Sequence, residues 1–381
     1  MNPLANLSEV KERNEKWWNR TNTSPVSYVV FEREPIPYDK LRKPWMSPDS
    51  LDGWSNWKQE IVFGHAVQLT HQTGDWQYVE DAIELLAEYP KYTGHAAEGY
   101  SFNLPMLGPG SLSACLSGFM KYYPPTIWLE LEEPWPWERV LALTETSRDP
   151  LWDTAIEAVR RHVARLQKLY VIAQPDHGGI LDVLASLVGT QELLMKMIEE
   201  PEEVLAVIGV LEKLWFKADA EFGTIIYPGN HGCYVRQMRW LSAKPVLTAV
   251  CDLCAMFGPD MFDRFVLPGI MRDCEKFDGR VIYHLDGPGQ LPHVDSLLKI
   301  EKLRAIQWVQ GAGNPPATDE CWHGLYRKII DAGKGICIDE CYERMDALKS
   351  LFAKFPSENF YLGFWANQSQ AAEAAEMLRI Q

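Results

Sequence analysis

From about residue 96 onward, short apolar runs rich in β-branched and aromatic residues alternate with longer amphipathic stretches. This alternation is typical of successive β-α units, because each crossover between parallel strands needs a connection about as long as a helix. Eight such runs occur, at residues 100–107, 126–131, 170–175, 246–250, 281–285, 305–309, 335–338 and 360–364. Eight units that close on themselves make a (β/α)8 TIM barrel, and this α/β architecture is the predicted fold.

An open doubly wound sheet is the alternative fold. It is disfavoured because no Gly-rich nucleotide fingerprint follows the first predicted strand, where Gly108-Pro109-Gly110 is too short a turn to cradle a dinucleotide. The chain before the repeating part is mostly helical in pattern, with an edge or accessory strand at residues 24–34. We therefore predict a mainly helical N-terminal elaboration over residues 1–95 that packs on a barrel formed by residues 96–381.

Charge and cysteine usage limit the classes of partner. A formal net charge of -15 without clusters of Lys and Arg disfavours nucleic acid. Eight cysteines scattered over 381 residues favour reduced thiols, and the polar start of the chain lacks the apolar core of a signal peptide. No apolar run reaches membrane-spanning length. We therefore expect a cytoplasmic protein with a small-molecule substrate and no membrane partner; a homodimer is compatible with this picture.

The fifth predicted strand ends in the sequence His284-Leu285-Asp286, which Gly287-Pro288-Gly289 stops abruptly. Residues two apart on a strand share a face, so we expect His284 and Asp286 to project together at its carboxyl end. An imidazole beside a carboxylate suits metal binding or acid-base chemistry. The alternative is a core histidine that a neighbouring acid satisfies, and the segment alone does not decide between them.

Polar side chains follow most of the other predicted strands at the same end, where TIM barrels build their active sites. They include Glu130, Glu132, Asp176, His177, Asp252, Gln307, Gln310, Cys337, Asp339, Glu340, Cys341 and Asn367. Imidazole, thiolate and carboxylate are the groups that Zn²⁺ binds in catalytic sites, with three protein ligands and one open position. The composition of these strand ends therefore favours a zinc site.

His284 and Cys337 are the leading ligand candidates, because their strands lie two apart around the barrel and inward residues of such strands can share a layer. Asp286, Glu340 and Cys341 compete for the third position. The alternative for Cys337 is a small buried hydrophobic residue. Cys251-x-x-Cys254 also occurs, but on a strand these two side chains would point to opposite faces, so we do not expect a paired metal site there.

Two aspartates follow apolar runs and are candidate catalytic residues. Asp252 and Asp176 would be costly to bury without a partner, and a carboxylate at a barrel mouth can act as a general acid or base or hold a substrate. The alternative is a helix N-cap, which is the stronger alternative for Asp176 because an apolar helical pattern follows Gly178-Gly179. Asp252 is the better candidate.

The substrate pocket is predicted from aromatic and polar residues near the strand ends. Trp308 and Trp365 could wall a pocket for a ring or a methylated cation, with Gln307 and His177 as polar contacts. The alternative for either tryptophan is ordinary core packing.

At several of these positions the chain resembles the uroporphyrinogen decarboxylase superfamily, over roughly residues 100–381. The similar segments are Gly108-Pro109-Gly110, Pro175-Asp176, Ile180-Leu181-Asp182, residues 189–194, residues 261–268 and His284-Leu285-Asp286-Gly287. The resemblance implies a (β/α)8 barrel. It also implies kinship with zinc-dependent methyltransferases, which move a methyl group by way of a corrinoid protein.

Matching the residues narrows what the resemblance implies. The methyltransferase members carry His-x-Cys at the fifth strand and a further Cys at the seventh; His284 and Cys337 match, whereas Asp286 replaces the middle thiolate. That replacement gives a harder site that is still suited to a Lewis acid. The decarboxylases need an arginine-rich N-terminal motif to hold several propionates, and no equivalent cluster is present, so porphyrinogen decarboxylation is disfavoured.

These observations lead to three functional hypotheses. The first is a zinc-dependent methyltransferase that moves a methyl group from a small O- or N-methylated compound to a corrinoid protein, with Asp252 or Asp176 orienting the substrate or protonating the leaving group. The second is a decarboxylase, a lyase that acts on a small cyclic or aromatic acid. The third is a barrel that binds its ligand without turnover.

Overall fold

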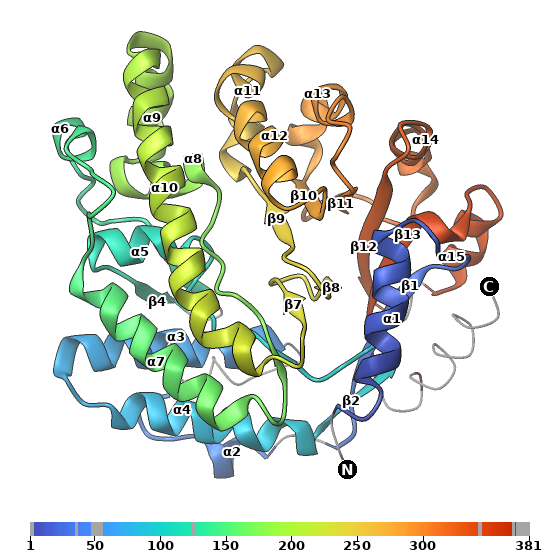
Figure 1. Ribbon diagram of the computed structural model, residues 1–381, viewed down its shortest axis with the longest axis horizontal. Coiled ribbons are helices and arrows are strands. Elements are labelled where there is room, and N and C mark those ends of the chain that lie inside the picture. The colour runs from blue at the N-terminus through green and yellow to red at the C-terminus, as the bar shows by residue number, and fades with distance from the viewer. Residues whose placement is uncertain are drawn as a thin grey trace. The chain divides into compact units, whose positions relative to one another are not determined.

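The computed structural model describes residues 4–34, 37–46, 56–123, 126–341, 345–367 and 370. It is an α/β protein that divides into two compact units (Figure 1). Unit 1 comprises Met1–Pro35, Pro90–Ser101 and Cys233–Gln381, and unit 2 comprises Ile36–Tyr89 and Phe102–Gly232. A separate N-terminal elaboration that ends at residue 95 stays a prediction.

Unit 1 contains a seven-stranded sheet with the order β2-β1-β13-β12-β11-β10-β9. Every neighbouring pair is parallel except β1 and β2. Its strands are β1 (Val26–Glu32), β2 (Thr93–Ala97), β9 (Leu247–Ala249), β10 (Val281–Asp286), β11 (Ala305–Val309), β12 (Gly335–Cys341) and β13 (Phe360–Asn367). A short antiparallel pair, β7 (Tyr234–Val235) and β8 (Leu241–Ser242), belongs to the same unit.

The helices of unit 1 mostly connect these strands, as parallel pairing requires. They are α1 (Leu7–Trp18), α11 (Pro259–Phe265), α12 (Leu267–Lys276), α13 (Val294–Leu298), α14 (His323–Asp331) and α15 (Met345–Phe352). Two 3₁₀ segments follow strands of the sheet, η4 (Asp252–Met256) after β9 and η5 (Pro288–His293) after β10.

Unit 2 is mainly helical. Its helices are α2 (Tyr38–Leu41), α3 (Asn56–Thr73), α4 (Gln77–Glu88), α5 (Ser111–Ser117), α6 (Trp137–Leu141), α7 (Pro150–Leu166), α8 (Ile180–Val188), α9 (Thr190–Glu199) and α10 (Pro201–Ile226). β3 (Phe102–Asn103) pairs in parallel with β6 (Val171–Ile172), and β4 (Lys121–Tyr123) pairs antiparallel with β5 (Thr126–Trp128).

The last five predicted strands are present in the predicted order, as β9 to β13. The strand predicted at residues 126–131 differs, because β5 pairs antiparallel with β4 and not with a parallel neighbour. Only two residues join β4 to β5, and so short a connection can link only antiparallel strands. In the described residues the sheet has β2 and β9 as its two edges, so its closure into an eight-stranded barrel stays a prediction.

The N-terminal strand also differs from its predicted place. β1 is not an edge strand but lies between β2 and β13, with parallel pairing from Val26–Tyr361 to Glu32–Asn367. Val26, Tyr28, Val29 and Val30 are all buried, as is typical of a strand whose two faces are both covered.

Helix α1 packs against the hydrophobic core of unit 1. Trp17 and Trp18 belong to one buried cluster with Val26, Tyr28, Val30, Trp240, Val246, Ile282, Ala305, Cys337 and Tyr361. The Trp18 indole nitrogen donates to the Leu241 carbonyl at 2.8 Å. The two tryptophans meet edge to face, with ring centroids 5.1 Å apart.

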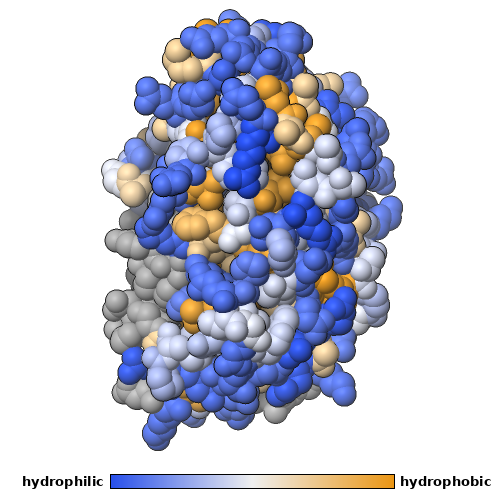
Figure 2. Space-filling model, turned by 90° about the vertical axis from the view of Figure 1, so that its left-hand side faces the viewer, coloured by the Kyte–Doolittle hydropathy of each residue, from blue (hydrophilic) through white to orange (hydrophobic). Residues whose placement is uncertain are grey.

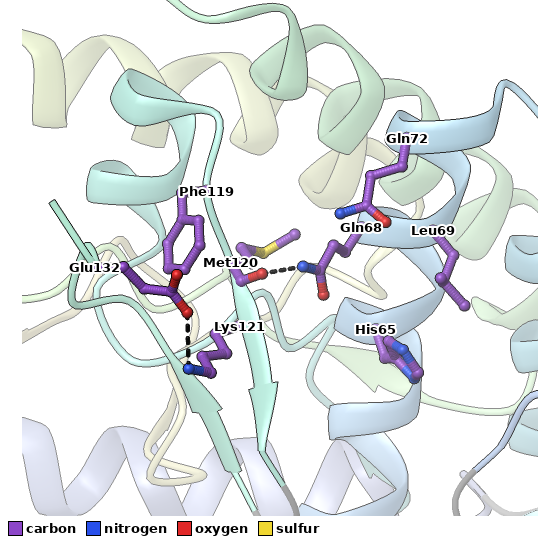
Figure 3. A pocket seen from close by; sticks show the side chains of 8 residues that line it. All are labelled: His65, Gln68, Leu69, Gln72, Phe119, Met120, Lys121 and Glu132. Atoms are coloured by element: carbon purple, nitrogen blue, oxygen red, sulfur yellow. Dashed lines mark hydrogen bonds and ion pairs between the residues drawn. The ribbon is translucent and has the colours of Figure 1, made fainter.

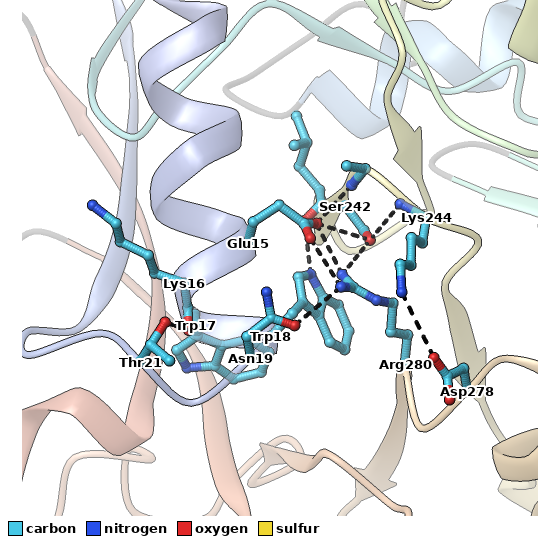
Figure 4. Close-up of polar contacts among 12 residues, drawn as sticks. Glu15, Lys16, Trp17, Trp18, Asn19, Thr21, Ser242, Lys244, Asp278 and Arg280 are labelled. Atoms are coloured by element: carbon cyan, nitrogen blue, oxygen red, sulfur yellow. Dashed lines mark hydrogen bonds and ion pairs between the residues drawn. The ribbon is translucent and has the colours of Figure 1, made fainter.

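A largely buried ion pair holds α1 against the start of β10 (Figure 4). The Arg280 guanidinium donates to both carboxylate oxygens of Glu15 and to Ser242 Oγ, each at 2.8 Å. The Ala243 amide donates to Glu15 at 2.7 Å. Partial burial opposes ionisation of Glu15, but these hydrogen bonds outweigh it and place the pKa of Glu15 below its usual value.

In the part of the chain that the structure describes, no helix combines the length and the apolarity needed to cross a bilayer. Figure 2 shows hydrophilic residues over most of one face, with smaller hydrophobic areas between them.

We predict that Glu15→Gln lowers the free energy of unfolding by roughly 3 kcal/mol at pH 7, because it leaves Arg280 without its counter-charge. Since the folded-state pKa of Glu15 is depressed, the wild-type advantage is complete above the unfolded pKa near 4.5 and disappears as the pH falls through the lower folded-state value. Urea unfolding at pH 7 and pH 3 measures both effects. The control is Glu12→Gln, which removes an exposed pair with Lys16 and should change little; equal losses in the two variants would contradict the prediction.

Candidate metal centre

Strand β10 brings His284 and Asp286 to one face of the sheet at its carboxyl end. Val281, Ile282, Tyr283 and Leu285 are buried, and His284 is half-buried. Gly287, with φ +77°, ends the strand in a conformation that side chains disfavour. The predicted placement of His284 and Asp286 is therefore observed.

Asp252 completes a group of three. It is the first residue of η4, which begins three residues after the end of β9, and β9 neighbours β10 in the sheet. One ligand atom each of Asp252, His284 and Asp286 lies within 4.8 Å of the other two. An imidazole and two carboxylates are a donor set that Zn²⁺ and harder divalent cations accept. We call these three residues the metal triad.

A chain of hydrogen bonds runs from the metal triad across three further strands. His284 Nδ1 and Gln307 Oε1 are 2.7 Å apart, Gln307 Nε2 donates to Asp339 Oδ2 at 3.0 Å, and the Tyr28 hydroxyl donates to Asp339 Oδ1 at 2.6 Å. His284 faces Gln307 in the parallel register of β10 and β11. We call these four residues the polar row.

The strand register explains how Tyr28 on β1 contacts Asp339 on β12 although β13 lies between these two strands. Gly363 on β13 pairs with Asp339 on one side and with Tyr28 on the other. A Cβ at position 363 would overlap both the Asp339 carboxylate and the Tyr28 hydroxyl. Because Gly363 has no side chain, the Tyr28 and Asp339 side chains can meet above β13.

The environment sets the proton positions at the far end of the polar row. Burial and the neighbouring Asp339 carboxylate raise the pKa of Tyr28 well above its usual value, so its hydroxyl stays protonated and donates. Desolvation by the surrounding protein raises the pKa of Asp339, although part of this residue is exposed to solvent. The hydrogen bonds from Tyr28 and Gln307 act in the opposite direction and lower it.

Cys337, one of the two leading ligands predicted from the sequence, does not join the metal triad. It belongs to the hydrophobic cluster with Ile282 and Ala305, each of which precedes a member of the polar row by two residues. Burial raises the pKa of the Cys337 thiol well above its usual value. The side chains of Glu340 and Cys341, the other candidates from β12, lie outside the described part of the chain.

The predicted substrate residues take different positions. Gln307 is 1 % exposed and lies in the polar row. Trp308, its neighbour on β11, packs against Trp322 with ring centroids 4.8 Å apart, on the opposite face of the sheet from Gln307. Trp365 is half-buried on the face of Gly363, and the Arg239 guanidinium lies 5.4 Å from its ring centroid.

Asp176 and His177 belong to unit 2, so a shared site with the metal triad stays a prediction. The Asp176 carboxylate accepts from the Gly178 amide at 2.9 Å, and its carbonyl accepts from the Ser111 amide at 2.8 Å. His177 Nδ1 lies 3.0 Å from the Ser111 hydroxyl, and its ring packs against Trp215. These contacts organise the turn that precedes α8.

Cys251 and Cys254 are not on a strand, which corrects the geometry expected from the sequence. Cys251 precedes η4 and Cys254 lies within it, and both side chains are buried. A hydrogen bond from the Cys251 thiol, together with His293 and Tyr283, lowers the pKa of Cys254 to about 6 despite burial. The 3₁₀ turn therefore brings together two thiols that strand alternation would have separated.

Unit 2 has a shallow pocket of about 280 Å³ of its own (Figure 3). It is lined by His65, Gln68, Leu69, Gln72, Phe119, Met120, Lys121 and Glu132. Lys121 pairs with Glu132 at 2.9 Å, Gln68 donates to the Met120 carbonyl, and burial lowers the pKa of His65 to about 4. Most of the polar groups in this pocket bind each other, so the chemistry of the chain is better sought at the metal triad.

Tyr28 and Gly363 were not predicted from the sequence, and Asp339 was noted only as one of several strand-end acids. The alternation of β1 could have placed Tyr28 on a strand face, but only the pairing of β1 with β13 identifies which face and which partner. A glycine within an otherwise apolar strand was the one available signal for Gly363.

Among solved structures, the chain is similar to a methyltransferase from Methanosarcina mazei. The two share 10% sequence identity, the alignment covers 97% of this chain and 98% of that chain, and the TM-score is 0.55. Comparison with family models and with curated protein sequences finds no match. At this identity the structural similarity shows a shared fold alone.

We predict that Gly363→Ala lowers the free energy of unfolding by about 1–3 kcal/mol, because the added methyl group forces Tyr28 and Asp339 apart. Urea denaturation measures the loss. In a double-mutant cycle with Tyr28→Phe the two effects should be less than additive, because both remove the same hydrogen bond. The matched control is Gly209→Ala in α10, which meets open space and should stabilise the protein by about 0.5–1 kcal/mol. Full additivity in the cycle would contradict this role of Gly363.

Proposed function

We propose that the chain is a zinc-dependent methyltransferase that moves a methyl group from a small O- or N-methylated compound to a corrinoid protein. The observation that carries the proposal is the convergence of Asp252, His284 and Asp286 at the carboxyl ends of two neighbouring parallel strands. The fold shared with a methyltransferase and the resemblance of the sequence support the reaction class. Membership of the uroporphyrinogen decarboxylase superfamily, a closed (β/α)8 barrel and a cytoplasmic location are parts of the same proposal.

The metal triad fits zinc by the chemistry of its donors. Catalytic zinc takes three protein ligands from imidazole, carboxylate and thiolate and leaves a fourth position open. Asp252 is exposed and His284 half-buried, so such a position would be accessible to a small molecule. A zinc ion bound there would supply a Lewis acid that polarises the heteroatom bearing the methyl group.

The chain's own residues would bind and orient the substrate. Trp365, half-buried beside Arg239, is the aromatic wall that we propose for the methylated group, because an indole face attracts a methylated cation and also packs against an ether. Asp252 has two proposed roles, as a ligand or as the acid that protonates the leaving group. Asp176 and His177 remain proposed contacts from unit 2.

We predict about one zinc ion per chain, with a loss of zinc affinity of more than about 100-fold in His284→Ala and in Asp286→Ala, since losing even an outer-shell partner costs about 10–100-fold. Calorimetric titration of metal-free protein with zinc measures the affinities. The matched control is Cys337→Ala, which removes a buried thiol of the hydrophobic cluster and should keep the zinc. Loss of zinc in Cys337→Ala, with retention in Asp286→Ala, would contradict the metal triad and show that a thiolate ligand holds the zinc in place of the Asp286 carboxylate.

The reaction itself can be tested with a reduced corrinoid and a panel of O- and N-methylated compounds. We expect the visible spectrum to report methylation of the corrinoid in the presence of zinc and not after chelation, because the leaving heteroatom would no longer be polarised. Asp252→Asn keeps an oxygen donor but removes a proton donor, so a loss of turnover without loss of zinc would assign it the acid role. Release of CO2 from a cyclic or aromatic acid, without methyl transfer, would instead support the lyase.

A further inference from the structure

The metal triad needs one particular tautomer of His284. Nδ1 lies 2.7 Å from Gln307 Oε1, so this nitrogen faces β11 and cannot also face a metal ion. Any ion would have to bind Nε2 as a lone-pair donor, which in a neutral imidazole requires the proton to sit on Nδ1. The residues that keep the proton on His284 Nδ1 therefore belong to the metal site as much as its ligands do.

We propose that Gln307, Asp339 and Tyr28 are positioning residues that hold His284 with its proton on Nδ1 and its Nε2 lone pair free for the metal. The inference rests on the proposed function for the identity of the ligand, but the tautomer itself is a property of the metal-free protein. None of the three residues has an atom in the metal triad, so they act through His284 and not on a substrate.

The direction of the chain of hydrogen bonds is set from its far end. Tyr28 donates to Asp339, whose other carboxylate oxygen accepts from Gln307 Nε2. Both Asp339 oxygens accept in these two hydrogen bonds, so the amide nitrogen of Gln307 faces Asp339 and its amide oxygen faces His284. A carbonyl oxygen only accepts as well, and the proton must therefore lie on His284 Nδ1.

The packing keeps Gln307 in that orientation. Its side chain is 1 % exposed, so water cannot readily replace Asp339 or His284 as a partner. Flipping the amide would set its oxygen against an Asp339 oxygen, which is a repulsive contact, and would leave that Asp339 oxygen without its donor. Because Gly363 has no side chain, Tyr28 can contact Asp339, and through Asp339 and Gln307 this glycine on β13 is connected to His284.

The experiment is ¹⁵N NMR of metal-free protein with labelled histidines, with the His284 signals assigned by their disappearance in His284→Gln. We expect wild-type His284 to carry its proton on Nδ1. Gln307→Leu should shift His284 toward the Nε2–H form and lower zinc affinity by about 10–100-fold, the usual cost of losing the partner of a ligating histidine.

A swapped pair gives the control that a merely structural role would not satisfy. Gln307→Glu alone places two carboxylates side by side and should weaken zinc binding. Combined with Asp339→Asn it restores the pattern, because the new amide on β12 would donate to the new carboxylate on β11 and accept from Tyr28, while that carboxylate would still accept from His284 Nδ1. Tyr28→Phe, two hydrogen bonds further from His284 than Gln307→Leu, should shift the tautomer in the same direction but less, and should lower zinc affinity less than 10-fold.

The outcomes separate this inference from the proposed function. An Nδ1–H form in the wild type that Gln307→Leu abolishes supports the positioning role, even if no zinc binds and the methyltransferase proposal fails. An Nε2–H form in the folded, metal-free wild type would overturn the inference, as would a tautomer unchanged in Gln307→Leu. Urea unfolding shows whether each variant is folded. If Gln307→Leu does not fold, the double variant Gln307→Glu with Asp339→Asn decides, and an Nε2–H form of His284 in it would overturn the inference.

Discussion

The parallel register of β10, β11, β12, β13 and β1 is the constraint on which the site depends. Because side chains alternate, each strand contributes every second residue to the same face. On one face, Ile282, Ala305 and Cys337 pack in a hydrophobic row, and the polar row takes its residues two positions later along the same strands. The pairing is staggered, since Gln307 is paired with His284 on one side and with Cys337 on the other. A slip of one residue in any strand would exchange these side chains for those of the other face.

Different interactions stabilise the structure at the amino ends and at the carboxyl ends of the parallel strands. At the amino ends, α1 covers the core with Trp17 and Trp18 and closes on Arg280 through Glu15. At the carboxyl ends, the polar row is connected by hydrogen bonds from Tyr28 to His284, which offsets the cost of holding polar groups against a packed sheet. The apolar end thus provides stability, whereas the polar end keeps the metal triad in place.

Much of the sheet was predictable because strands β9 to β13 are short apolar runs bounded by turn residues. The same reasoning placed His284 and Asp286 together, since that inference needs only the alternation of a single strand. It also placed Cys337 near them, and Cys337 is the register partner of Gln307. The side chain of Cys337 packs in the hydrophobic cluster, however, and the β12 side chain that contacts Gln307 is Asp339. The shift along the sheet between neighbouring strands decides which residues share a layer, and no pattern within one strand contains that information.

The parts that sequence reasoning missed depend on contacts between distant segments. Tyr28 meets Asp339 only because β1, from the start of the chain, pairs with β13 near its end. Asp252 joins the metal triad because η4 begins three residues after the end of β9, and the same turn brings Cys251 and Cys254 together. Such placements follow from tertiary pairing, which a local pattern does not specify.

The most direct test of the metal triad is X-ray absorption at the zinc edge on the protein loaded with one equivalent of zinc. With Asp252, His284 and Asp286 as ligands, the first shell should contain only nitrogen and oxygen atoms at about 2.0–2.2 Å. A sulfur shell at about 2.3 Å would show that a cysteine holds the ion and would contradict the account.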